Sequence, residues 1–138
     1  MIYQEVIIPK YDWRVQCFFA VDGYYLDDIM EKLWEIGCDG STAKKAYDNI
    51  NANELNTGLC YSNARMRETV IVTAITSSAS EFAHSWVHEL SHCAVHIAQA
   101  SNIDIRGEEF CYLIGDLAKT LHLFVSDLLC DCCRTEKR

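Results

Sequence analysis

The chain contains 138 residues, of which half are apolar and only one is proline. That composition excludes a disordered or low-complexity chain, and the length predicts a single domain over residues 1–138 with an ordinary hydrophobic core. The formal net charge of −8 argues against nucleic acid or an anionic membrane as the main partner, since both attract clustered Lys and Arg side chains.

The start of the chain gives no sign of a secretory signal. Residues 1–5 lack a basic segment that is followed by an apolar run. No uncharged apolar stretch in the sequence is long enough to span a bilayer. We therefore expect a cytoplasmic protein without a membrane partner.

Eight cysteines fall into two groups. In a reducing compartment we expect the five that are dispersed among apolar neighbours to be small buried hydrophobic residues, namely Cys17, Cys38, Cys60, Cys93 and Cys111. Cys130, Cys132 and Cys133 lie close together and could hold a second metal or form a redox pair. They lack the distant partner pair that is typical of a structural zinc site.

Two strands are predicted at the start of the chain. Residues 5–8 and 13–21 both have strand character. In the second run the apolar residues alternate at period two, which predicts a strand; they are Trp13, Val15, Cys17, Phe19 and Val21.

Two helices are predicted next. Residues 26–36 carry an apolar stripe at helical spacing, which Gly37 ends. Ser41 is expected to cap a second, more polar helix that reaches Ile50. The Asn-rich segment 49–56 is expected to be a connection.

Residues 58–62 and 69–75 predict two further strands, and the second is rich in β-branched residues. Ser78 followed by Glu81 then has the form of a capping box, so we expect a helix to begin near Ser78. One face of this helix is apolar and consists of Phe82, Ala83, Trp86, Leu90, Cys93, Ala94 and Ile97.

The segment His88-Glu89-Leu90-Ser91-His92 places two histidines on the opposite side of this helix. Residues four apart lie one turn above each other, with Cβ atoms about 5–6 Å apart, so His88 and His92 can share one zinc ion. Glu89 lies about 100° round the helix from His88, close enough to reach a water on that metal without ligating it. This is the general-base position of a metallohydrolase.

His84 and His96 continue the same spacing along the helix. One zinc ion cannot bind all four histidines, because eight residues of helix rise about 12 Å. We expect His84 and His96 to be partly exposed or hydrogen-bonded helical histidines, with support of a metal ligand as the alternative. His122, on a later helix, is expected to have no role in the site.

A catalytic zinc needs a third protein ligand and one position open to water. A final long helix is expected to begin near Asp104 and to carry Glu108 and Glu109 in its first turns. The turn between the two helices is short, so a carboxylate there could complete a His, His, Glu set.

This part of the chain resembles the compact gluzincin-type zinc metallopeptidases, including small zincin-like proteins of phages and mobile elements. The resemblance is carried by the motif helix, the short loop after it and the segment Gly-Glu-Glu-x-x-Tyr-Leu-x-Gly at residues 107–115. The resemblance covers roughly residues 56–115. It implies an α+β, zincin-like fold with a small sheet, an active-site helix and a long C-terminal helix. In that family pattern the third ligand commonly stands four residues before the Tyr, which is Glu108 here. Helical periodicity places Glu109 nearer the apolar stripe, so both remain candidates.

These residues predict a zinc-dependent metallopeptidase in which Zn²⁺ is held by His88, His92 and Glu108. Glu89 would take a proton from the attacking water and return it to the leaving amine. Tyr112 is the nearest candidate for a second electrophile. The resemblance also implies that residues 58–76 hold the strand that binds an extended peptide or protein substrate, with a purely structural hairpin as the alternative.

Three other functional classes stay open. The first is a zincin fold that binds metal without hydrolysing anything. The second is a metal-dependent regulatory or interaction protein of a phage or mobile element, whose acidic surface would bind a protein partner. The third is a redox or metal-storage protein that uses Cys130, Cys132 and Cys133.

Overall fold

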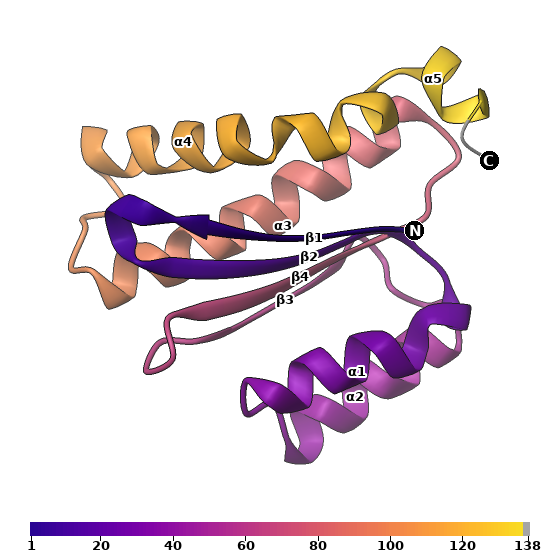
Figure 1. The fold of residues 1–138 in the computed structure, drawn as a ribbon, viewed down its shortest axis with the longest axis horizontal. Helices are drawn as coiled ribbons and strands as arrows, with labels where there is room; N and C mark the ends of the chain where they lie inside the picture. Colours follow the sequence, from indigo (N-terminus) through magenta and orange to yellow (C-terminus); the bar gives the residue numbers. More distant parts are fainter. Residues whose placement is uncertain (137–138) are drawn as a thin grey trace.

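The computed structural model describes the backbone of residues 1–136 and the side chains of residues 1–133. Within this part, one four-stranded sheet lies between two pairs of helices, which confirms the predicted α+β class (Figure 1). The strands are β1 (Ile2–Ile8), β2 (Trp13–Val21), β3 (Gly58–Asn63) and β4 (Glu68–Ala74). The helices are α1 (Leu26–Glu35), α2 (Gly40–Asn51), α3 (Ala79–Ala100), α4 (Glu108–Val125) and the short α5 (Asp131–Glu136).

The strand order in the sheet is β1-β2-β4-β3. β1 pairs with β2 and β3 pairs with β4 in antiparallel fashion, whereas the two central strands, β2 and β4, are parallel. A parallel pair requires a crossover connection, and here α1, α2 and β3 supply it. The strand order places β3 at one edge of the sheet.

Each face of the sheet has its own apolar core. α3 and α4 cover the face that carries Val15, Cys17 and Ile71, whereas α1 and α2 cover the face that carries Val70 and Val72 (Figure 1). Strands buried on both faces are apolar along their whole length. This explains why β4 shows an almost continuous apolar run rather than a clear alternation.

The strand predicted over residues 13–21 is confirmed, but its side-chain alternation reverses between Phe19 and Val21. Between Phe18 and Val21, β2 has one residue more than the paired segment of β4, and Ala20 adopts a left-handed conformation with φ of 59°. Such a bulge reverses the side-chain alternation. Val21 therefore packs with Phe18 in the core beneath α1 and α2.

The two helices of the first half form as predicted, with one difference in capping. α1 ends where expected, and Gly37 follows it with a left-handed φ of 86°. α2 begins at Gly40 after Asp39, so the prediction that Ser41 caps this helix was wrong. The helix also runs to Asn51, into the segment predicted to be a connection.

The start of α3 confirms the predicted cap. The Ser78 hydroxyl accepts a hydrogen bond from the Glu81 amide at 3.2 Å. The Glu81 carboxylate instead accepts from the amide and hydroxyl of Ser77, so the capping box is shifted by one residue on that side. α4 begins at Glu108, later than the predicted start near Asp104, which lies in the preceding turn and accepts a hydrogen bond from the Arg106 amide.

None of the helices in the described chain has the combination of length and apolar character needed to cross a membrane.

We expect that no side chain larger than that of glycine can be accommodated at position 58, where β3 lies close to β4. Gly58 has a φ of 149°, and a Cβ there would overlap the carbonyl oxygen of Val72. Gly58→Ala should therefore lower the free energy of unfolding by about 2 kcal/mol or more. Denaturant unfolding measures the change.

Gly115→Ala is the matched control, because Gly115 lies inside α4 with open space where its Cβ would be. It should raise stability by about 0.5–1 kcal/mol. Equal stability of the two variants would contradict the packing of β3 on β4.

Candidate metal site on helix α3

His88 and His92 lie on the exposed side of α3, one helical turn apart. The opposite side buries Phe82, Leu90 and Ile97 against the sheet, so the predicted separation of the histidines from the apolar face is confirmed. The two imidazole rings are adjacent, with their Nε2 atoms 3.3 Å apart. The two ring centroids are 4.9 Å apart and the rings are inclined at 70°.

The distance between the two Nε2 atoms matches the requirement of a shared zinc ion. Two Zn–N bonds of about 2.0–2.1 Å at a tetrahedral angle place their nitrogens about 3.3–3.4 Å apart. The separation of the two Nε2 atoms is thus that of two neighbouring ligands on a tetrahedral zinc. The same distance suits an N–H···N hydrogen bond between two neutral imidazoles, so the pair is compatible with both a free and a metal-bound state.

Glu89 points away from solvent, between α3 and the start of β3. Its side chain is 2% exposed, and its Oε1 atom accepts a hydrogen bond from the Thr57 hydroxyl at 2.8 Å. Thr57 directly precedes the edge strand β3. The carboxylate is therefore held at the junction of the motif helix and the sheet edge, next to the histidine pair in sequence but shielded from bulk water.

The two candidate third ligands open helix α4. Glu108 and Glu109 are both exposed, and α4 packs mainly on α3 and β1. Among the residues whose side chains the structure describes, no group of three or more His, Cys, Asp or Glu is arranged to hold a metal ion. The structure thus brings His88 and His92 together and does not bring Glu108 or Glu109 to them. Tyr112, the candidate second electrophile, is 64% exposed on α4.

The remaining histidines differ from one another. His84 is exposed, with its ring centroid 6.3 Å from that of His88, and His122 is exposed on α4. His96 is half-buried, and its Nδ1 lies 2.7 Å from the Ser62 hydroxyl of β3. Burial lowers the pKa of His96, and the neighbouring His92 lowers it further. The prediction of a hydrogen-bonded helical histidine is confirmed for His96.

Behind Ser62 the hydrogen bonds continue through the sheet. The Ser62 and Thr69 hydroxyls are 2.7 Å apart, and the Trp13 indole N–H donates to Thr69 Oγ1 at 2.8 Å. We call these four residues, including His96, the His96 relay. It joins β2, β4, β3 and α3. Analysis of the sequence missed it, because its members are linked by strand pairing rather than by spacing in the sequence.

A hollow of about 300 Å³ adjoins the His96 relay. Three of its lining residues come from α3, and the others come from β2 and the end of β3: they are Trp13, Ser62, Ala64, His96, Gln99 and Ala100. The lining contains no Lys, Arg, Asp or Glu, and His96 is its one titratable side chain. The hollow lies one to two helical turns from His92 on the same helix.

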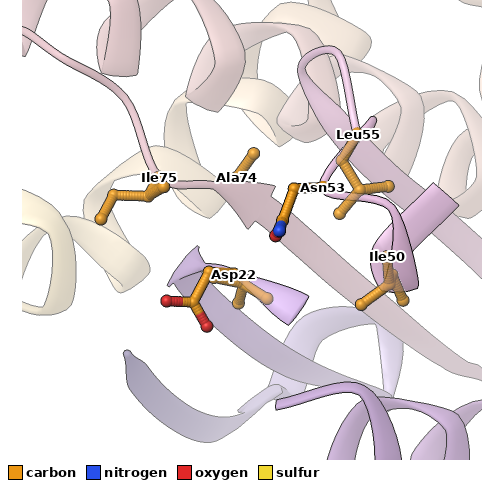
Figure 2. Close-up of a pocket in the computed structure, with 7 residues that line it drawn as sticks. Asp22, Ile50, Asn53, Leu55, Ala74 and Ile75 are labelled. Carbon is orange, nitrogen blue, oxygen red and sulfur yellow. The ribbon is translucent and has the colours of Figure 1, made fainter. Parts of the chain in front are cut away.

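A smaller hollow of about 80 Å³ lies where the parallel strands β2 and β4 end, a common place for ligands in parallel sheets (Figure 2). Its polar groups are already engaged. Asn53 Oδ1 accepts from the Gly23 amide at 2.7 Å, and Asp22 Oδ1 accepts from the Tyr24 amide at 3.0 Å. In Figure 2 the Asp22 carboxylate is turned away from Asn53. These groups close a loop rather than form a reactive site.

Four of the five dispersed cysteines agree with the predicted hydrophobic role. Cys17, Cys38 and Cys93 are buried and Cys60 is partly buried, whereas Cys111 is exposed, so the prediction was wrong for Cys111. Burial raises the pKa of Cys17, and the adjacent Cys93 thiol together with burial raises the pKa of Cys60. These two thiols are accordingly poor nucleophiles at neutral pH.

No protein-family model matches the chain, and no curated protein or solved structure matches it either.

We expect Cys130 to be the more reactive member of the C-terminal cysteine pair that it forms with Cys133. The pKa of Cys130 is lowered by hydrogen bonds from the backbone N–H and the thiol of Cys133 and from the backbone N–H of Cys132. The same contact with Cys130 raises the pKa of Cys133. Alkylation with iodoacetamide at pH 7, followed by peptide mass spectrometry, should label Cys130 before Cys133. Faster labelling of Cys133 would contradict this arrangement.

Proposed function

We propose that this protein is a zinc-dependent metallopeptidase with a zincin-like arrangement of its active-site helix and edge strand. One observation carries the proposal: two exposed imidazoles, one turn apart on α3, present their Nε2 atoms at 3.3 Å, the spacing of two ligands on a tetrahedral zinc. The sequence places a carboxylate between them, at Glu89, where a metallohydrolase needs its general base.

His88 and His92 would hold the zinc, and Glu108 is the proposed third ligand, with Glu109 as the alternative. The role of Glu108 rests on the resemblance in residues 107–115, because both carboxylates stand apart from the histidine pair. Bound zinc would supply Lewis acidity that activates a water and polarises a carbonyl group.

Glu89 is proposed to take the proton from the attacking water and to pass it to the leaving amine. Its position supports this role in one respect, because the carboxylate lies where the motif helix meets the edge strand that is proposed to bind the peptide. The Thr57 hydroxyl, 2.8 Å from Oε1, would fix the orientation of the carboxylate. A substrate peptide would pair with the free edge of β3, whose main-chain groups on that side have no strand partner in the described sheet.

One observation favours a second candidate, a zinc-binding protein of regulatory function without hydrolysis. Glu89 is 2% exposed and already hydrogen-bonded, as a structural carboxylate would be. In that case His88 and His92 would bind zinc to fix α3 for an interaction with a partner protein. The two candidates agree about the metal and differ about Glu89.

Zinc content tests the metal site. We expect about one zinc per chain in the wild type after dialysis, almost none in His92→Ala, and weakened binding in Glu108→Ala, because each change removes a ligand. Elemental analysis of the purified proteins gives the ratio. His84→Ala is the matched control, since it removes an exposed histidine from the same helix and should leave the zinc in place. Retention of zinc by His92→Ala would exclude the proposed site.

Glu89→Gln separates the two candidates. Gln keeps an oxygen that can accept from Thr57, so zinc content and stability should stay close to those of the wild type. Loss of the general base should lower the rate of peptide cleavage by about 10²–10⁴-fold. Cleavage of a peptide library, followed by mass spectrometry, measures this rate. A zinc-loaded wild type that cleaves nothing, or a Glu89→Gln variant of undiminished activity, would contradict the peptidase proposal.

A further inference from the structure

We propose that His96 is a substrate-binding residue, which donates a hydrogen bond from its Nε2 atom to an uncharged side chain of the substrate in the adjoining hollow. The inference rests on the proposed peptidase function and names a substrate class for it: peptides that carry Gln or Asn about two residues from the cleaved bond. Three observations support it, namely the direction of the His96 relay, the lining of the hollow and the distance from the zinc pair.

The direction of the relay follows from its first member. An indole N–H can only donate, so Thr69 Oγ1 accepts from Trp13. Thr69 is fully buried, and its hydroxyl hydrogen finds its acceptor within the relay at Ser62 Oγ. We assign the Ser62 hydrogen to Nδ1 of His96, which the Cys60 Sγ atom also approaches at 3.9 Å. The reverse direction would leave the Thr69 hydrogen without an acceptor in the relay, which is costly for a buried hydroxyl.

In this assignment His96 is a neutral ring with its proton on Nε2. Nδ1 accepts from Ser62, so Nε2 is the ring nitrogen that carries hydrogen. Within the described residues Nε2 has no hydrogen-bond acceptor, and the ring lines the hollow of about 300 Å³. The relay therefore presents one oriented donor to whatever enters this space.

The lining determines the chemistry of the occupant. Besides His96, its polar side chains are Gln99 and Ser62, and it contains no Lys, Arg, Asp or Glu. A substrate carboxylate would find no cation among these residues and would meet a protein of net charge −8. An uncharged side chain with a carbonyl oxygen can accept from Nε2–H, and its amide can bond with Gln99. Gln and Asn have these groups.

The spacing places this subsite beside the proposed zinc site. The ring centroids of His92 and His96 are 6.4 Å apart, about one helical turn. An extended peptide advances about 3.3 Å per residue, so this distance corresponds to about two residues of substrate. Ser62 belongs to β3, along whose edge the peptide is proposed to run.

The relay can be tested without zinc or substrate. Two-bond ¹H–¹⁵N spectra of zinc-free protein at pH 7.5, with His96→Leu used to assign the signals, should identify a bare, hydrogen-bonded Nδ1 and a protonated Nε2 on His96. Ser62→Ala should shift the Nδ1 resonance while leaving those of His84 unchanged. A proton on Nδ1 in the wild type would overturn the proposed direction of the relay and the role of His96 as a donor.

The substrate class is tested by cleavage of a proteome-derived peptide library. Zinc-loaded wild type should prefer Gln or Asn to Met or Leu at one position by about five- to tenfold in kcat/KM, mainly through KM. His96→Leu should abolish the preference with little change in kcat, and His96→Gln, whose amide can replace the Nε2–H donor, should restore part of it. His84→Leu is the control and should keep the preference.

The possible failures are distinguishable. Zinc-dependent cleavage with the same preference in His96→Leu as in the wild type would overturn the substrate assignment and leave the peptidase proposal standing. A wild type that binds no zinc and cleaves no peptide would overturn both. Zinc content and circular dichroism of each variant show whether a loss of preference reflects misfolding.

Discussion

The packing of α3 against the sheet is the constraint on which the rest of the structure depends. Burial of one large apolar side chain stabilises a fold by about 1.5–3 kcal/mol, and α3 fully buries Phe82 and Ile97 in the core it shares with β2 and β4. These anchors fix the rotation of the helix about its axis. Once that rotation is set, His88 and His92 must face outward and Glu89 must face the start of β3. A site assembled on a rigid helix gains orientation at no separate cost in chain entropy.

The two flanks of α3 have different surroundings, which bears on where a substrate can lie. One flank packs on α4, whereas the other approaches β3 through the Glu89–Thr57 and His96–Ser62 contacts. These two contacts are polar and lie on either side of His92 along the helix. A peptide that runs along the free edge of β3 would therefore pass the proposed base, metal ligands and hydrogen-bond donor in turn. The hollow where β2 and β4 end offers no comparable set of groups.

Local features of the sequence predicted the elements well, because each element is determined by short-range chemistry. The Ser78 cap, the apolar stripe of α3 and the outward histidine pair could all be read from spacing, and the structure confirms them. The reversal at Val21 could not be predicted, since a bulge depends on pairing with β4, about fifty residues away. The His96 relay was missed for the same reason. Glu108 and Glu109, exposed at the start of α4, stand apart from the histidine pair, because the placement of one helix start beside another helix depends on tertiary packing and not on sequence spacing.

The most direct test of the central claim is X-ray absorption at the zinc edge of the zinc-loaded protein, which identifies the atoms bound to the metal. We expect two imidazole nitrogens at about 2.0–2.1 Å, with oxygen donors completing the coordination sphere. Together with a loss of zinc from His92→Ala, this result would place the zinc on the histidine pair of α3. Sulfur ligands at about 2.3 Å would contradict the claim, since they would assign the metal to cysteines such as Cys130, Cys132 and Cys133 instead.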